Sequence, residues 1–513
     1  MQGLNFRLPH TILNLTQSPR LPSLRGGAGP TSTAAGVAVS VDRQADETTI
    51  SPEIDEELKL PKTASLVIVL LSNVLLQITF FIIVSSSNDY AQHLGGTSTF
   101  SGLVIGIPTA VSGLTLLPLM RFDQGVYQRP LHLTCASMVV GNVLYGLAYR
   151  ANWLYLILLG RIVCGFGFTF WMYNKRYCSD PRIVGIRRRT TLAGWLVLGQ
   201  GLGFSSGPFF GGLLYKVGFR NSIFNGYTSP AWVMAACWLL FWVAVCMWFE
   251  DVPRTPQKPI ALRSMPTSTT RKESNKDKGD SSTTTAEADV RVSASGSPTL
   301  PRSPPAPRGP LHKMTPQQWG VCATMCWFAM TTFFILGAWE SNIPVFTSSA
   351  EPTNPFHFTP FAAGNLIALG GVCTIPFLLL NLGFARRVQD RHTLALGTSL
   401  GVAGLLIALG ILKGRRVSYG TLWLSWFLVA LGFNIASTVT LSLLSKQLPG
   451  EWNGRISLFI QWSNYTGRVT GAVFGGSGVK IGMLNYVGVQ LAYVGVGYVM
   501  FLTLWKHLKA KTG

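Results

Sequence analysis

The sequence predicts an all-α membrane protein with twelve transmembrane helices in two six-helix halves. Three observations lead to this prediction. The 513 residues are 48% hydrophobic and only 12% charged, whereas soluble proteins carry about 25% charged residues. The apolar residues form long runs, each long enough to cross a bilayer core of roughly 30 Å. A polar stretch divides these runs into six and six.

The first half is expected over residues 63–249, after a polar tail. The tail, 1–62, is rich in Pro, Ser and Gly and is expected to be disordered and cytosolic. The expected spans of this half are 63–85, 100–120, 131–149, 153–173, 191–214 and 231–249.

The second half is expected over residues 317–505. The linker before it, 250–316, is rich in Ser, Thr, Pro and Lys, and it lacks apolar periodicity, so we expect it to be disordered and cytosolic. A short cytosolic tail, 506–513, ends the sequence. The expected spans of this half are 319–339, 360–382, 394–412, 422–444, 456–479 and 486–505.

Charge and cysteine usage bound the function classes. Lys and Arg concentrate in the loops on one side of the predicted bundle, which predicts cytosolic termini and accounts for the net charge of +21 without a nucleic-acid partner. Nearly all of the eight cysteines lie in apolar runs, where a free thiol packs as a small hydrophobe. Neither a metal-ligand spacing nor a nucleophile–base pair stands out, so we expect no metal, no cofactor and no enzyme.

The fifth expected span is unusually rich in glycine. Small residues let membrane helices approach closely, and a proline within the span predicts a kink. A generic Gly-rich packing helix is the alternative interpretation. The order of residues resembles motif C of the major facilitator superfamily of transporters, which implies a conformational role for these positions. The motif reads Gly203-x-x-x-Gly207-Pro208-x-x-Gly211-Gly212.

Two arginines lie within apolar spans, where ionisable groups are costly and usually functional. Arg161, followed four residues later by Gly165, resembles the fourth-helix motif of the same superfamily; Arg468 lies near the middle of the eleventh span. Because Arg stays charged and presents a planar fork of donors, the two are expected to bind an anionic substrate between the halves. A structural Arg bonded to backbone carbonyls is the alternative, and it weighs equally for Arg161.

Other polar residues are candidates for lining the substrate site. Helix–helix hydrogen bonds are the alternative for each of the amides, and an interfacial anchor is the alternative for the arginine. The candidates are Asn73, Gln77, Arg176, Gln461 and Asn464.

Carboxylates are scarce in the spans. Glu340, at the end of the seventh span, is the one plausible coupling group, and a solvated loop position is its alternative. Coupling is therefore either weak or absent, or it runs through Glu340. Asp123 and Gly125 echo the superfamily's loop motif between helices 2 and 3, one residue short in spacing, which predicts a conformational latch at Asp123.

Three further segments narrow the resemblance: 174–180, 224–232, and 442–446 leading into Gly467-Arg468. Together they resemble the branch that holds the SPX-MFS vacuolar phosphate transporters and the lysosomal ceroid-lipofuscinosis protein. Arg468 matches the eleventh-helix Arg of that branch, Arg161 the fourth-helix Arg, and Arg176 the Arg before the Tyr. The resemblance implies an inorganic anion such as phosphate or chloride, and a vacuolar or lysosomal membrane, with the plasma membrane as the alternative. The tail is too short for an SPX domain, so sensing by that domain is not implied.

These features predict a monomeric secondary transporter that moves a small anion by alternating access, with membrane lipid as its surroundings. An exporter of organic metabolites or drugs is the alternative within transport, because motif C is common among exporters and aromatic residues are plentiful. A non-transporting receptor or scaffold that signals through the linker is the alternative from another class.

Overall fold

The computed structural model describes residues 59–122, 125–180, 182–219, 221–252, 314–384, 388–447 and 452–509. All belong to one compact unit, Pro52–Gly513. Most of the expected tail, 1–62, and most of the expected linker, 250–316, lie outside the described residues. Throughout the described ranges the regular structure is helical, with no strand.

Each expected span of the first half corresponds to a helix or a helix pair. The fourth span is divided between two helices, and a short helix, α4, follows the first span. The helices are α3 (Thr63–Phe81) with α4 (Ser87–His93), α5 (Ser98–Phe122), α6 (Gln128–Ala151), α7 (Leu154–Phe168) with α8 (Phe170–Ser179), α9 (Ile186–Val217) and α10 (Ser229–Trp248).

The second half repeats this pattern, with one boundary that differs clearly from expectation. The seventh span was expected to end at residue 339, but its helix continues to Ser348 and so contains Glu340. The helices are α11 (Pro316–Ser348), α12 (Pro360–Phe384), α13 (Asp390–Lys413), α14 (Tyr419–Gln447), α15 (Asn453–Gly476) with α16 (Gly478–Ile481), and α17 (Met483–Thr503).

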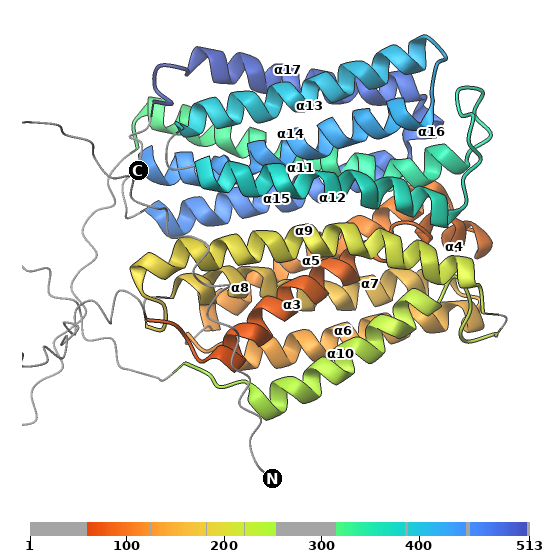
Figure 1. Cartoon of the computed structure of the whole chain (residues 1–513), viewed down its shortest axis with the longest axis horizontal. Helices are drawn as coiled ribbons and strands as arrows, with labels where there is room; N and C mark the ends of the chain where they lie inside the picture. Colours follow the sequence, from red (N-terminus) through yellow and green to blue (C-terminus); the bar gives the residue numbers. More distant parts are fainter. Residues whose placement is uncertain are drawn as a thin grey trace, which may run out of the picture. The chain divides into compact units, whose positions relative to one another are not determined.

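In the described part of the chain, ten helical segments are long enough and apolar enough to cross a membrane. The long helices α9 and α15 lie outside these ten, because glycines and polar residues lower their hydropathy. Figure 1 shows the helices of each half lying side by side, with α9 and α5 facing α12 and α15 across the boundary between the halves. The predicted fold class is confirmed. The end of the bundle at which α3 begins and α17 ends is called the terminal end below.

The glycine motif of α9 lies where this helix meets two others. A Cβ on Gly203 or Gly207 would overlap atoms of α3, and one on Gly211 would overlap the carbonyl of Ile82, which directly follows α3. A Cβ on Gly212 would overlap the backbone of Phe361 on α12. The helix continues through Pro208. The motif therefore allows close packing both within the first half and across to the second. Its role in conformational change stays a prediction.

Three glycines of α15, at four-residue spacing, let this helix lie directly against α11. A Cβ on Gly467, Gly471 or Gly475 would overlap a backbone carbonyl of α11. The carbonyls belong to Met330, Phe334 and Ala338, which also follow one another by one turn. Helix association in a membrane relies on such close packing rather than on a hydrophobic force. This contact sets the positions of the charged side chains of the two helices.

Candidate functional site between the halves

Arg468 and Glu340 form a buried ion pair between α15 and α11. The Arg468 Nη2 atom donates to Oε2 of Glu340. Arg468 is 9% exposed and Glu340 only 1%. Gly337 lies against the Arg468 backbone, one turn before Glu340, and so brings the two helices together at this level. The interpretation of Glu340 as a solvated loop residue is therefore wrong, because α11 continues past it into the protein interior.

Neighbouring polar groups fix the helix segment that carries Glu340. The Trp339 indole donates to the Gln490 side chain on α17 at 2.8 Å. Ser341 and Asn342 donate to backbone carbonyls of α15, each at 2.9 Å. A buried ion pair needs this kind of support, because its desolvation cost is repaid only by good geometry. The carboxylate is thus held toward Arg468 by bonds on both sides of it in sequence.

Arg161, on α7, is 1% exposed. Its contacts have features of both interpretations made from the sequence, a structural arginine and an anion-binding arginine. Its Nε and Nη1 atoms donate to the backbone carbonyls of Val104 and Thr79, each at 3.3 Å, as the structural alternative requires. Its Nη2 atom is buried and has no hydrogen-bond partner. Within the described part of the chain, no carboxylate pairs with Arg161. One donor of a buried cation is therefore left for another acceptor.

The two buried arginines share an aromatic neighbour, Phe80 of α3. The Cζ atoms of Arg161 and Arg468 lie 5.7 Å and 5.0 Å from the centroid of its ring. The two Cζ atoms are therefore no more than about 11 Å apart, close enough for their charges to repel in a low-dielectric interior. With Glu340 as the partner of Arg468, the residues around Phe80 therefore include two buried cations and one buried anion.

The amide candidates lie around these helices in different roles. Asn73 donates to the Leu196 carbonyl of α9 at 2.9 Å, which is the helix–helix bond given as the alternative. Gln77 is half-buried beside Gly203. Gln461 bonds the Tyr465 hydroxyl. The buried Oδ1 atom of Asn464 has no hydrogen-bond partner. None of the hydrogen bonds described for these amide side chains reaches Arg161 or Arg468.

Arg176 does not join the two buried arginines. It is exposed on α8, with its Cζ atom 6.0 Å from the centroid of the Tyr127 ring. It follows Arg161 by fifteen residues, or about 22 Å along a helix axis. The structure therefore places it at the terminal end, away from the central pair.

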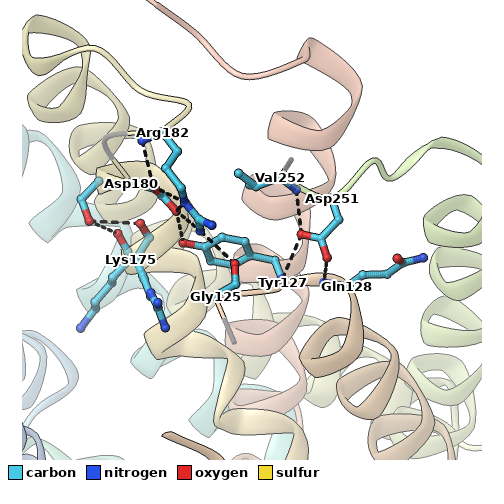
Figure 2. Close-up of polar contacts among 10 residues, drawn as sticks. Gly125, Tyr127, Gln128, Lys175, Asp180, Arg182, Asp251 and Val252 are labelled. Atoms are coloured by element: carbon cyan, nitrogen blue, oxygen red, sulfur yellow. Dashed lines mark hydrogen bonds and ion pairs between the residues drawn. The ribbon is translucent and has the colours of Figure 1, made fainter. Parts of the chain in front are cut away.

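A polar network at the terminal end joins three connecting segments of the first half (Figure 2). Asp180, between α8 and α9, accepts from the Tyr127 hydroxyl at 2.8 Å and from Arg182 Nη2 at 2.6 Å. Arg182 also donates to the Gly125 carbonyl at 2.9 Å, and Asp251 accepts from the backbone N–H of Tyr127 at 3.0 Å. The loop before α6, the loop before α9 and the end of α10 are thus tied together.

The latch predicted at Asp123 lies outside the described residues and stays a prediction. The carboxylates of the network, Asp180 and Asp251, are not among the candidate site residues, although Asp180 ends the segment 174–180 that carries part of the family resemblance. Asp251 also accepts from the N–H of Gln128, the first residue of α6, which is a favourable place for a negative charge. The two-residue spacing of Asp180 and Arg182 could have indicated their ion pair from the sequence. Their other partners, Tyr127 and Gly125, come from a distant part of the chain and could not be found in this way.

Replacing Asp180 with Asn is expected to lower stability at pH 7 by about 1–3 kcal/mol, because hydrogen bonds to a charged group are lost. Burial alone would raise the pKa of Asp180, but the bonds from Arg182 and Tyr127 outweigh it and lower that pKa. A lowered native pKa gives stability that is present above about pH 3.9 and is lost as pH falls through the native pKa. Thermal melts from pH 7 to 3 should show the wild type and variant converging in acid.

The exposed ion pair of Lys62 and Glu250 provides a control for Asp180→Asn. Lys62→Gln should change stability by less than about 1 kcal/mol, as for other surface pairs. A constant gap between wild type and Asp180→Asn at every pH would show that the ionised carboxylate does not stabilise the network.

Metal ligands are not gathered anywhere in the described residues: no group of three His, Cys, Asp or Glu side chains could hold an ion. All eight cysteines are free. The arrangement between the halves instead offers guanidinium donors, one carboxylate and aromatic rings. It is suited to binding a small anion and to exchanging a proton at the carboxylate.

Comparisons with known proteins identify the family and agree with the fold. The family model of the Major Facilitator Superfamily matches residues 69–472. An uncharacterized MFS-type transporter of Schizosaccharomyces pombe is 29% identical over 469 residues, 90% of this chain and 85% of that protein. An SPX domain-containing membrane protein of Arabidopsis thaliana is 35% identical over 188 residues, 36% of this chain and 26% of that protein. A POT family transporter, solved in complex with 5-aminolevulinic acid, has a similar fold, with a TM-score of 0.63, 11% identity, and coverage of 89% of this chain and 99% of that one.

Proposed function

This chain belongs to the Major Facilitator Superfamily of transporters, and we propose that it carries a small inorganic anion, bound between Arg161 and Arg468. The observation behind this proposal is the imbalance of buried charge: two guanidiniums, one from each half, lie within about 11 Å of one another, and of these two only Arg468 pairs with a carboxylate among the described residues. An unpaired buried charge is costly, and an anion bound near it offsets that cost. The unpartnered Nη2 atom of Arg161 supplies a donor for it.

Glu340 is the coupling group of this proposal. When ionised, it occupies an N–H group of Arg468 that an anion would otherwise use. A proton on Glu340 removes the competing charge, so Arg468 can turn to the anion. Proton and anion are therefore loaded together, and rocking of the two halves carries both across the membrane.

Inorganic phosphate and chloride are the first anions to test, and a vacuolar or lysosomal membrane is the proposed location. Both choices rest on the resemblance of the segments around Arg176 and Arg468 to that branch. The positive charge at the terminal end supports placing that end in the cytosol.

Uptake of labelled phosphate and chloride into proteoliposomes tests the proposal. A pH gradient and a membrane potential are imposed separately on the wild-type protein. Accumulation of one anion that follows the pH gradient is expected. Uptake of neither anion by folded protein would contradict the proposal, and the same vesicles would then be tested with organic solutes for the exporter alternative.

Glu340→Gln is expected to lower proton-driven accumulation about tenfold, the size of an ordinary coupling free energy. The neutral amide imitates the protonated carboxyl, so anion exchange across the membrane without a gradient should persist. Both quantities are measured in the same vesicles. Glu351→Gln, in the loop after α11, is the matched control and should leave both unchanged. Equal loss of exchange and accumulation would contradict a role for Glu340 in coupling.

A further inference from the structure

The guanidinium of Arg468 lies over two aromatic rings of the opposite half. Its Cζ atom is 5.0 Å from the centroid of Phe80 and 5.1 Å from that of Phe81, both on α3. The two rings meet edge to face, with centroids 5.0 Å apart and planes at 71°. Phe80 is 1% and Phe81 3% exposed. Phe80 and Phe81 are called the aromatic platform below.

The platform holds the arginine without using its hydrogen-bond donors. A cation is attracted to the face of an aromatic ring, whereas the N–H groups of a guanidinium project from its edge. Arg468 therefore keeps Nη2 on Glu340 while its charge is stabilised by the rings. The remaining edge of the group stays available to an anion.

Phe80 is fixed by the first half. It packs edge to face against Phe168, with centroids 5.6 Å apart, and lies 5.8 Å from Trp171. Arg161 lies over the same ring. The position of Phe80 thus depends on α7 and α8 as well as on α3.

Phe81 is fixed from another side, by α9. Its ring packs edge to face against Phe204 at 4.8 Å, and the close approach of Gly207 leaves no room for a Cβ between them. The platform is therefore packed directly against the glycine motif of α9.

We propose that the aromatic platform positions Arg468 for the anion, with Phe80 as the principal positioning residue. The inference rests on the proposed function, because it assumes that Arg468 binds an anion. Since α3 and α15 belong to different halves, Arg468 rests on the rings only while the halves keep the arrangement described here. When the halves rock apart, Arg468 is left with Glu340 alone, which competes for its donors. Anion affinity is consequently higher in the arrangement with Arg468 on the platform.

Phe80→Leu tests this inference, because it removes the ring face while keeping an apolar side chain. In proteoliposomes, the KM for the transported anion should rise about tenfold, while the maximal rate changes by less than about twofold. Phe80→Tyr retains the ring face and should restore most of the affinity. Phe328→Leu is the matched control: Phe328 is 2% exposed and packs on Phe501 of its own half. It should cost stability without a change in KM.

A thermal double-mutant cycle tests the contact without any anion. Phe80→Leu should lower the melting temperature more in the wild-type background than in the Arg468→Gln background, where only the loss of its packing against Phe168 and Trp171 remains. Phe328→Leu should lower it equally in both. Additive shifts for Phe80 and Arg468 would overturn the platform.

The two measurements separate the inference from the function on which it rests. A non-additive cycle with a raised KM supports the platform as a positioning device. A non-additive cycle with an unchanged KM overturns the positioning role. Absence of anion transport by the wild type overturns the proposed function, and with it the role of Phe80 in anion binding.

Discussion

Arg468→Gln is expected to reduce anion uptake about a hundredfold or more, since it removes a buried charge that the substrate needs. It should also lower stability by about 3–5 kcal/mol, because the Glu340 carboxylate is left buried without its partner. Adding Glu340→Gln to this variant is expected to recover most of the stability and none of the uptake. The two effects of Arg468 are thereby separated: the charge balance of the fold and the binding of the substrate.

Melting temperature and uptake are measured on the same four proteins: wild type, the two single variants and the double variant. Arg176→Gln serves as the control, because Arg176 is exposed at the terminal end. It should melt like the wild type and keep most of its uptake. Substantial uptake by the double variant would show that the anion site lies elsewhere in the protein. A double variant less stable than Arg468→Gln would contradict the view that the ion pair is what stabilises the buried charges.

Arg468 was recognisable from the sequence, and Glu340 only partly. A charge in the middle of an apolar run stands out in any hydropathy profile. Glu340 falls among polar residues where the profile drops, and the predicted span therefore ends at 339. The helix continues because Ser341 and Asn342 bond to backbone carbonyls of α15. Such helix–helix bonds depend on which helices are neighbours, and one sequence does not contain that information.

The aromatic platform shows the same limit. Phe80 and Phe81 lie within a very apolar span, where phenylalanine is just as common facing lipid, and nothing local marks them as neighbours of two arginines. The glycine motif of α9 was readable because its spacing matches one helix face. Its partners on α3 and α12 became visible only in the folded chain. Local composition therefore predicted the elements and the rare charges, while the pairings required the tertiary structure.

Gly471→Ala is expected to have the second largest effect, although it adds a single methyl group. That group would overlap the Phe334 carbonyl of α11, so the helices must separate or one must shift along the other. Overpacking of this kind costs about 1–3 kcal/mol. A displacement near 1 Å at a functional contact can cost about a hundredfold in rate. Uptake should therefore fall much more than the loss of stability alone would cause.

Gly488→Ala on α17 is the matched control, because a Cβ at Gly488 meets nothing within 4 Å. It should leave uptake unchanged and raise stability slightly, since Ala is the better helix former by about 1 kcal/mol. Melting temperature and uptake are again compared for both variants. If Gly471→Ala loses stability but keeps uptake, then the spacing of α11 and α15 does not determine how Glu340 meets Arg468. A loss of uptake larger than the loss of folded protein can explain would show that the close packing of the α15 glycines on α11 maintains the geometry of the ion pair.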